Sequence, residues 1–375
     1  MATELQPARA SQSVLTVDLG AVAANYRLLR ARLSRARCGA AVKADGYGLG
    51  AARIAGALAK AGCEDFFVAD LGEAIALREA LLPSARVYVL NGLLPGEAEE
   101  FCRHGIVPVL NDLGQIAAWA AAARVVGRPL PAIVHFDTGM SRLGLPPAEA
   151  ACLADDPLRL SGIDLHYVMS HLACADEPEH PLNHAQLAEF DLLRRRFQNV
   201  AASLANSSGI FLGPDYHFDL ARPGCALYGI NPVPGHLNPM TPVVRLEAKI
   251  LQLREIDPPR TVGYGAAHRV TAKIRVATVA AGYADGWLRA LSGRGGAYVG
   301  DIRVPFAGRV SMDLITLDVT AAPQVRVGDS VELMGEHLPV DDIAATAGTI
   351  GYEILTRLGS RFHRRYINDF PPAGA

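Results

Sequence analysis

The chain has 375 residues, and half of them are hydrophobic, which is enough for two or three domains with a large core. Its 36 Lys and Arg against 38 Asp and Glu give a formal charge of -2, so nucleic-acid binding has no electrostatic support. The six cysteines form no C-x-x-C pair, so we expect no metal site and a reduced, cytoplasmic setting. Residues 1–13 lack a signal core, and the apolar run 116–123 is too short to span a bilayer, so we expect no membrane association.

Residues 34–222 repeat a short apolar strand, a polar or glycine-bearing stop and a helical stretch rich in Ala, Leu and Arg. This alternation predicts a parallel α/β architecture, and eight units predict a (β/α)8 TIM barrel. We expect the strands at Cys38–Val42, Phe66–Ala69, Val87–Leu90, Val107–Leu110, Ile133–Phe136, Gly162–Met169, Ser203–Ala205 and Phe218–Ala221.

Polar residues follow these predicted strands and would gather on one rim of the barrel, where such folds build their active sites. They are Lys43, Asp70, Asn91, Asn111, Asp137 with Arg142, His171, Asn206 with Ser207, and Arg222. Polar residues also follow strands simply because loops are polar, so the ring alone is a weak signal.

After about Pro239 the sequence alternates between apolar and polar residues, which predicts a mostly antiparallel β domain. The expected strands are Val243–Leu253, Ile274–Ala280, Ala297–Phe306, Leu314–Val319 and Ser330–Met334. One helix is predicted at 341–347, with Asp341 or Asp342 as its N-cap, and the termini 1–11 and 371–375 are expected to be frayed.

Lys43 is the most informative residue, because it lies between an apolar run and the glycine-rich segment DGYGLG. Burial among Ala41, Val42 and Ala44 would lower the pKa of its amine from about 10.4 and make it a nucleophile and a base. A lysine with a solvated head on the barrel rim is the alternative.

The segment VKADGYG, residues 42–48, resembles the cofactor-lysine signature of bacterial alanine racemases, and further motifs follow in order from about Val14 to Tyr366. The resemblance implies a barrel that binds pyridoxal 5'-phosphate, at 14–240, and a C-terminal β domain, at 241–375. It also implies a homodimer that interconverts L- and D-alanine, for peptidoglycan or for catabolism, and in which each subunit completes the other's site.

Within this resemblance, ARPGCALYG at 221–229 makes Arg222 the partner of the pyridine nitrogen. An arginine is always cationic and disfavours protonation of that ring, which keeps negative charge near the reacting carbon. The residues implied to bind the cofactor phosphate are Asn206, Ser207, Gly224, Cys225 and Tyr352. Taken alone, Arg222 could form a rim ion pair, Ser207 could cap a helix and Tyr352 could be half-buried core.

Racemisation needs a base on each face of a planar intermediate, and the resemblance assigns these roles to Lys43 and Tyr264, the latter in TVGYGAA. An ordinary tyrosine is a poor base at neutral pH, so cationic character nearby is required. His171, in SHLACAD, matches the histidine that bridges Tyr264 and Arg222, although it could instead be a rim histidine bonded to a carbonyl.

Further matches concern the substrate and its access path. Arg142 in DTGMSRLG and Met312 in GRVSMDLITLDVT are implied to bind the substrate carboxylate. Tyr47 would line the cofactor, whereas Tyr283 and Asp313 would form a gate at the narrow entrance. Turn chemistry in a β domain is the alternative for the last two.

The chain departs from the family pattern at His135, where many members carry a lysine that is often carbamylated. The anionic charge that such a group places beside Arg142 must then come from elsewhere or be absent. Ser311 and His268 are smaller departures on the substrate side. Alternatives on the same fold are a serine or broad-specificity racemase, a decarboxylase, which Arg222 disfavours, and a non-catalytic cofactor-binding protein, which the β domain disfavours.

Overall fold

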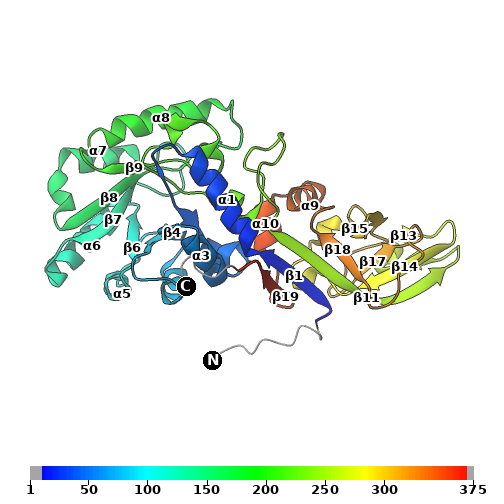
Figure 1. The fold of residues 1–375 in the computed structure, drawn as a ribbon. Helices are drawn as coiled ribbons and strands as arrows, with labels where there is room; N and C mark the ends of the chain where they lie inside the picture. Colours follow the sequence, from blue (N-terminus) through cyan, green and yellow to red (C-terminus); the bar gives the residue numbers. More distant parts are fainter. Residues whose placement is uncertain (1–10, 370–375) are drawn as a thin grey trace.

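Eight short parallel strands close into a barrel in the first lobe of the computed structural model, which describes residues 11–369 (Figure 1). The first strand is split into β2 (Arg37–Cys38) and β3 (Ala40–Ala41), and the others follow in chain order. They are β4 (Asp65–Val68), β5 (Arg86–Val89), β6 (Val107–Leu110), β7 (Leu130–His135), β8 (Ile163–Met169), β9 (Ala201–Ser203) and β10 (Leu220–Ala221). Strands β3 to β9 form one parallel sheet, and β10 closes it by pairing with β2, so the predicted barrel is confirmed.

The barrel interior is filled by large side chains, as expected for strands that are buried on both faces. Phe67, Tyr88, Ile133 and Met169 are among the buried residues of this inner cluster. The break between β2 and β3 falls at Gly39, where a Cβ atom would lie 3.0 Å from both Asp65 O and an aromatic carbon of Phe67. A glycine is needed there because the strands approach too closely for a side chain.

Helices surround the barrel and connect its strands (Figure 1). They are α1 (Leu19–Arg32), α3 (Ala51–Lys60), α4 (Leu71–Ala80), α5 (Ala98–His104), α6 (Leu113–Val126), α7 (Pro147–Asp155) and α8 (Pro181–Arg194). The side chains of Asp70 and Asp112 cap the first turns of α4 and α6. Between β9 and β10 the chain forms only two one-turn helices, η2 (Ser208–Ile210) and η3 (Pro214–Tyr216).

The second lobe is a mostly antiparallel sheet built on the long strand β11 (Val244–Ile256). Its other strands are β1 (Ser13–Asp18), β14 (Ile274–Val279), β15 (Gly296–Val299), β16 (Ile302–Pro305), β17 (Ile315–Asp318), β18 (Ser330–Met334) and β19 (His363–Ile367). The single strand expected at 297–306 is thus a hairpin, because the chain turns between Val299 and Ile302. Strand β1 pairs with β11 and β19, so the start of the range 14–240 contributes to this sheet.

A small hairpin, β12 (Thr261–Val262) and β13 (His268–Arg269), carries the one-turn helix η5 (Tyr264–Ala266). Helix α9 (Val340–Ala347) matches the predicted helix, but the predicted N-cap is wrong. Pro339 occupies the cap, and Asp341 and Asp342 lie in the first turn, where their charges still favour the positive end of the helix.

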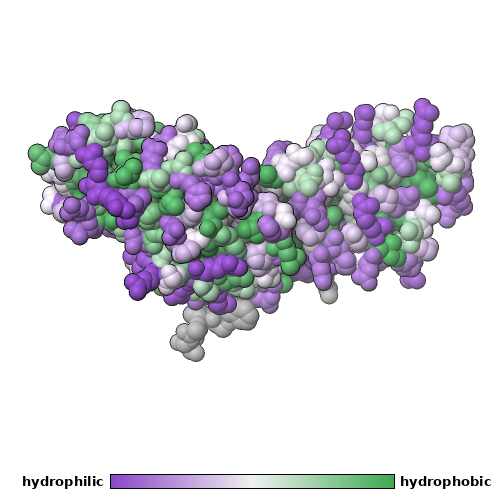
Figure 2. All heavy atoms as spheres, turned by 90° about the horizontal axis from the view of Figure 1, so that it is seen from above, coloured by the Kyte–Doolittle hydropathy of each residue, from purple (hydrophilic) through white to green (hydrophobic). Residues whose placement is uncertain are grey.

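The two lobes meet where α10 (Gly351–Thr356) packs against α2 (Lys43–Tyr47), at the junction in Figure 1. Figure 2 shows the lobes from above, joined at a narrower waist, with hydrophilic residues spread over both. Among residues 11–369, no helix is both long and apolar enough to cross a membrane. Apart from Ser11, the termini predicted to be frayed lie outside the described residues.

Candidate active site

A cavity of about 580 Å³ lies at the carboxyl ends of the barrel strands. Apart from the α10 residues, its lining comes from strand ends and the loops that follow them. The lining residues are Ala41, Lys43, Ala44, Tyr47, Phe67, Ala69, Leu90, Asn91, His135, Arg142, Leu143, Met169, His171, Asn206, Ser207, Arg222, Gly224, Cys225, Tyr352 and Thr356. The cavity therefore brings together eleven residues that the sequence had singled out as cofactor, substrate or rim residues, together with His135.

Lys43 lies two residues after β3, at the start of a left-handed turn. Ala44, Asp45 and Tyr47 all have positive φ, between 52° and 56°, and Gly46 and Gly48 continue the turn. Burial lowers the pKa of Lys43, and the cation of Arg142 lowers it further, whereas Glu73 opposes the shift. A lowered pKa increases the share of the amine that carries a free lone pair, as a nucleophile or base requires.

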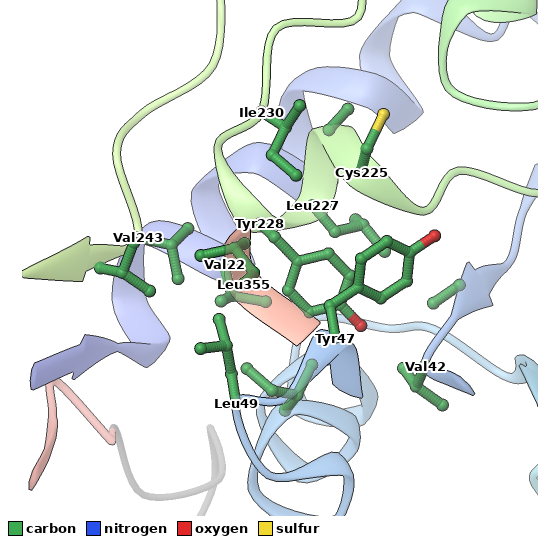
Figure 3. Close-up of a cluster of buried hydrophobic side chains, with 14 of the residues drawn as sticks. Val22, Val42, Tyr47, Leu49, Cys225, Leu227, Tyr228, Ile230, Val243 and Leu355 are labelled. Atoms are coloured by element: carbon green, nitrogen blue, oxygen red, sulfur yellow. The ribbon is translucent and has the colours of Figure 1, made fainter. Parts of the chain in front are cut away.

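Tyr47 is held by aromatic contacts at the end of this turn. Its ring stacks on Tyr228 with centroids 4.3 Å apart, and Figure 3 shows the two rings side by side. Tyr352 of α10 contributes a second ring, 6.0 Å away. Burial raises the pKa of both Tyr47 and Tyr352, so these phenols are neutral and can donate hydrogen bonds.

Arg222 is buried, and other barrel residues fix its orientation. Its Nη2 donates to Ser170 O at 2.7 Å and lies 3.4 Å from His171 Nδ1, and its Nη1 donates to Ser203 Oγ. Burial, and then the Arg222 cation, hold the pKa of His171 well below its usual value. His171 is therefore neutral, and because Nδ1 accepts from the arginine, Nε2 carries the proton and can donate onward.

Backbone N–H groups and hydroxyls cluster where β9 and β10 end. Ser207 Oγ accepts from Gly224 N at 2.9 Å and from Ala226 N at 3.3 Å, and Asn206 Oδ1 accepts from Gly209 N at 2.9 Å. A Cβ atom at Gly224 would lie 2.3 Å from Tyr47 Oη, so a glycine is needed here because the tyrosine hydroxyl packs directly against it. These bonds fix Ser207 and Asn206, whose hydroxyl and amide N–H groups are the donors here that suit a phosphate group.

His135 is buried and hydrogen-bonded to Asn111, with Nδ1 2.8 Å from Asn111 Oδ1. The Asn111 amide nitrogen donates to two backbone carbonyls, so its oxygen must accept, and the proton lies on His135 Nδ1. Burial, with a further contribution from Arg222, lowers the pKa of His135 to about 3. His135 is thus neutral and supplies no anionic charge to Arg142.

Asp137 shapes the loop that carries Arg142. Its Oδ1 accepts from the backbone N–H groups of Gly139, Met140 and Ser141, each at 3.0 Å. This carboxylate orders the three residues that precede Arg142. Asp137 is also the acidic residue of the motif DTGMSR.

The rim residues Asp70, Asn111 and Asp137 do not line the cavity, and neither do the four residues that the sequence assigned to catalysis, substrate binding or the entrance in the β domain. Tyr264 is 72% exposed, Met312 53% and Tyr283 42%, and Asp313 pairs with Arg361 at 2.7 Å. The loop that carries Tyr283 is hydrogen-bonded to the loop that carries Met312 and Asp313: Tyr283 N donates to Ser311 O, and Ala284 N donates to Met312 O. Within one chain these side chains do not meet Lys43, so their assigned roles stay predictions.

Sequence reasoning missed Glu73, which bonds the Lys43 turn, and Thr356 and Leu143, which line the cavity. Thr356 could have been found, because it lies one helical turn after Tyr352 on the same face of α10. Glu73 offered no motif, and only the folded chain brings it to Ala44. Among residues 11–369, no group of three or more His, Cys, Asp and Glu side chains could hold a metal ion.

Two protein families match this chain. The family described as "Alanine racemase, N-terminal domain" matches residues 17–232, and "Alanine racemase, C-terminal domain" matches residues 243–366. The two matches together extend over most of the chain and meet near the boundary between the barrel and the β domain.

Individual proteins are also similar over nearly the full length. A catabolic alanine racemase of Mesorhizobium japonicum is 54% identical over 360 residues, covering 96% of this chain and 94% of that protein. An alanine racemase of Brucella abortus is 48% identical over 373 residues, with the same shares covered. The crystal structure of Bartonella henselae alanine racemase with covalently bound pyridoxal phosphate has a TM-score of 0.92 and 40% identity, covering 95% of this chain and all of that one.

Proposed function

This chain belongs to the alanine racemase family, and from that premise we propose that it interconverts L- and D-alanine with pyridoxal 5'-phosphate held on Lys43. The observation that carries the proposal is the meeting of Lys43, Arg222 and the polar side chains of Asn206 and Ser207 in one cavity. D-Alanine formed in this way would serve peptidoglycan synthesis or alanine catabolism, and the cytoplasmic location expected from the sequence stays a prediction.

The residues present suit this cofactor. Ser207, Gly224, Cys225, Asn206 and Tyr352 all line the cavity and would hold its phosphate. When bound, pyridoxal 5'-phosphate supplies an electron-withdrawing system that stabilises negative charge at the α-carbon of an amino acid. Arg222, already fixed by Ser203 and Ser170, would face the ring nitrogen and leave it unprotonated.

Lys43 would hold the cofactor and then take or return the α-proton on one face of the substrate. Its burial and the nearby cation of Arg142 lower the pKa of its amine, which favours a free lone pair for this task. Cations and a dry cavity around one amine are a common way to prepare a lysine for catalysis.

Tyr264 would serve the opposite face, and it would come from the partner subunit of a homodimer. Its 72% exposure outside the cavity of its own chain supports a role in trans. His171 supports it further, because Nε2 carries a proton that can be donated to a phenol oxygen, while Nδ1 accepts from Arg222. This chain of hydrogen bonds transmits the arginine's positive charge toward the tyrosine and favours its ionised form.

Arg142 would bind the substrate carboxylate, assisted by Met312 of the partner, and Tyr283 and Asp313 would narrow the entrance. The loop held by Asp137 orients Arg142, and neutral His135 leaves its positive charge uncompensated and available to the substrate. No carbamate is needed at position 135 in this arrangement.

The test is the chirality of alanine after cofactor-loaded protein is incubated with pure L-alanine, with L-serine, L-lysine and L-arginine in parallel. Appearance of D-alanine supports the proposal, and D-alanine alone defines a narrow specificity. Turnover only of another amino acid would favour a serine or broad-specificity racemase. Absence of any D-amino acid would refute racemisation.

A further inference from the structure

We propose that Glu73 is a positioning residue that holds the backbone turn behind Lys43 and places a negative charge beside this residue. The inference rests on the proposed role of Lys43 as the cofactor lysine. No sequence motif marks Glu73, and the inference is drawn from the hydrogen bonds of its carboxylate.

The turn that follows Lys43 has an unfavourable backbone conformation. Ala44, Asp45 and Tyr47 are L-residues with φ of 53°, 52° and 56°. Such a left-handed conformation costs roughly 1–2 kcal/mol for each non-glycine residue, so it persists only where surrounding contacts enforce it. The contacts that hold this turn therefore fix the backbone position from which the Lys43 side chain extends.

Glu73 contacts the residue that directly follows Lys43. Its Oε1 accepts from Ala44 N, the amide directly after Lys43, at 2.6 Å. Its Oε2 accepts from Ala69 N, just after β4, at 2.8 Å. One carboxylate thus ties the loops that follow two adjacent barrel strands, β3 and β4, on the cavity rim.

Helix capping explains only half of this arrangement. Asp70 Oδ1 accepts from Glu73 N at 3.0 Å, while Glu73 Oε2 accepts from Ala69 N at the start of the same helix, much as in a capping box. A cap of this kind uses one carboxylate oxygen. The second oxygen reaches a segment 29 residues away, which adds nothing to the cap of α4.

The charge of Glu73 matters because the residues that line the cavity, which do not include Glu73, are neutral or cationic. Its titratable lining consists of Arg142 and Arg222, the neutral His135 and His171, the phenols of Tyr47 and Tyr352, and the Cys225 thiol. Burial raises the pKa of the phenols and of the thiol, so these groups carry no negative charge at neutral pH. Arg142 lowers the pKa of Lys43, and Glu73 is the group that raises it.

The charge is tested by titrating the visible absorbance of the cofactor-loaded enzyme with pH. Glu73→Gln keeps one oxygen for Ala69 but removes the charge, so the midpoint should move to lower pH by roughly one unit. Asp70→Ala removes the other half of the same helix cap, so it should lower the melting temperature without moving the midpoint. An unshifted midpoint in Glu73→Gln would overturn the charge role.

The positioning role is tested with Glu73→Asp, which keeps the charge but is too short to bridge both amides. This variant should keep the wild-type midpoint and lose kcat by about tenfold or more, with KM little changed. An unchanged kcat would overturn the positioning role. The two failures can be told apart. If the wild-type protein shows no cofactor band, the proposed function is refuted. If the wild-type band is normal and both Glu73 variants behave like the wild type, only this inference is refuted, because Lys43 is intact in both variants.

Discussion

Replacing Gly224 with alanine tests how closely the phosphate cradle packs against the Lys43 turn. The new Cβ atom would lie 2.3 Å from Tyr47 Oη and 3.2 Å from its Cζ, whereas ordinary van der Waals contacts begin near 3.4 Å. The tyrosine would have to shift by about 1 Å, although it is only 6% exposed and stacked on Tyr228.

Overpacking of a buried site costs typically about 1–3 kcal/mol. A disturbed stack between Tyr47 and Tyr228 would add about 0.5–1.5 kcal/mol. We therefore expect Gly224→Ala to lower the free energy of unfolding by about 2 kcal/mol or more, measured by urea unfolding at one fixed protein concentration. The variant should also release cofactor faster during dialysis, because a shifted Tyr47 would disturb the part of the cavity lining that is expected to hold the cofactor.

A double-mutant cycle separates this mechanism from a general loss of stability. Tyr47→Phe removes Oη, the atom that a Cβ would overlap most, so the cost of Gly224→Ala should fall by half or more in that background. Gly56→Ala is the matched control: its Cβ would meet nothing within 4 Å, and as a residue inside α3 it should gain up to about 1 kcal/mol. An equal cost of Gly224→Ala with and without the Tyr47 hydroxyl would refute the reasoning.

Three further predictions concern the proposed bases and the buried histidine. Lys43→Ala should lose both the visible colour of bound cofactor and all racemisation; colour at wild-type strength would exclude Lys43 as the attachment point. Tyr264→Phe should keep the colour but fail to exchange the α-proton of L-alanine, followed by NMR in deuterated water, and retained exchange from the L side would remove Tyr264 from its role. His135 has a pKa of about 3 in the folded chain and about 6.5 when unfolded, so the unfolded state binds more protons between these values. The free energy of unfolding should therefore fall as the pH drops from about 6.5, by at most about 1.4 kcal/mol per pH unit, and His135→Gln should reduce this slope; an equal slope in both proteins would contradict the assignment.

Much of the barrel follows from local patterns in the sequence. Strand β6 lies where it was predicted, and the other seven are shifted at their ends by a few residues, because apolar runs define strands better than their ends. The rim residues follow for the same reason, since strand ends in a parallel barrel all face one side.

Other features depend on distant partners and have no local signal. Strand β1 looks like any amphipathic strand, and only its pairing with β11 and β19 assigns it to the second lobe. The left-handed turn at Ala44 and Asp45 has no local signal, because non-glycine residues seldom adopt positive φ. Two hydrogen bonds hold it: Ala44 N donates to Glu73, and Ala51 N donates to the Asp45 carboxylate. Likewise, the pKa of His135 depends on burial and on its tautomer, which Asn111 fixes from the neighbouring strand.

The central claim is that each site combines Lys43 of one subunit with Tyr264 of the other, and mixing two inactive variants tests it most directly. Lys43→Ala and Tyr264→Phe proteins are unfolded and refolded together, and racemisation of L-alanine is measured. A mixed dimer then contains one site with both native residues, so activity should return to about a quarter of the wild-type value. If both residues acted within the same chain, every site would lack one base, and a mixture that stays inactive although mixed dimers have formed would contradict the account.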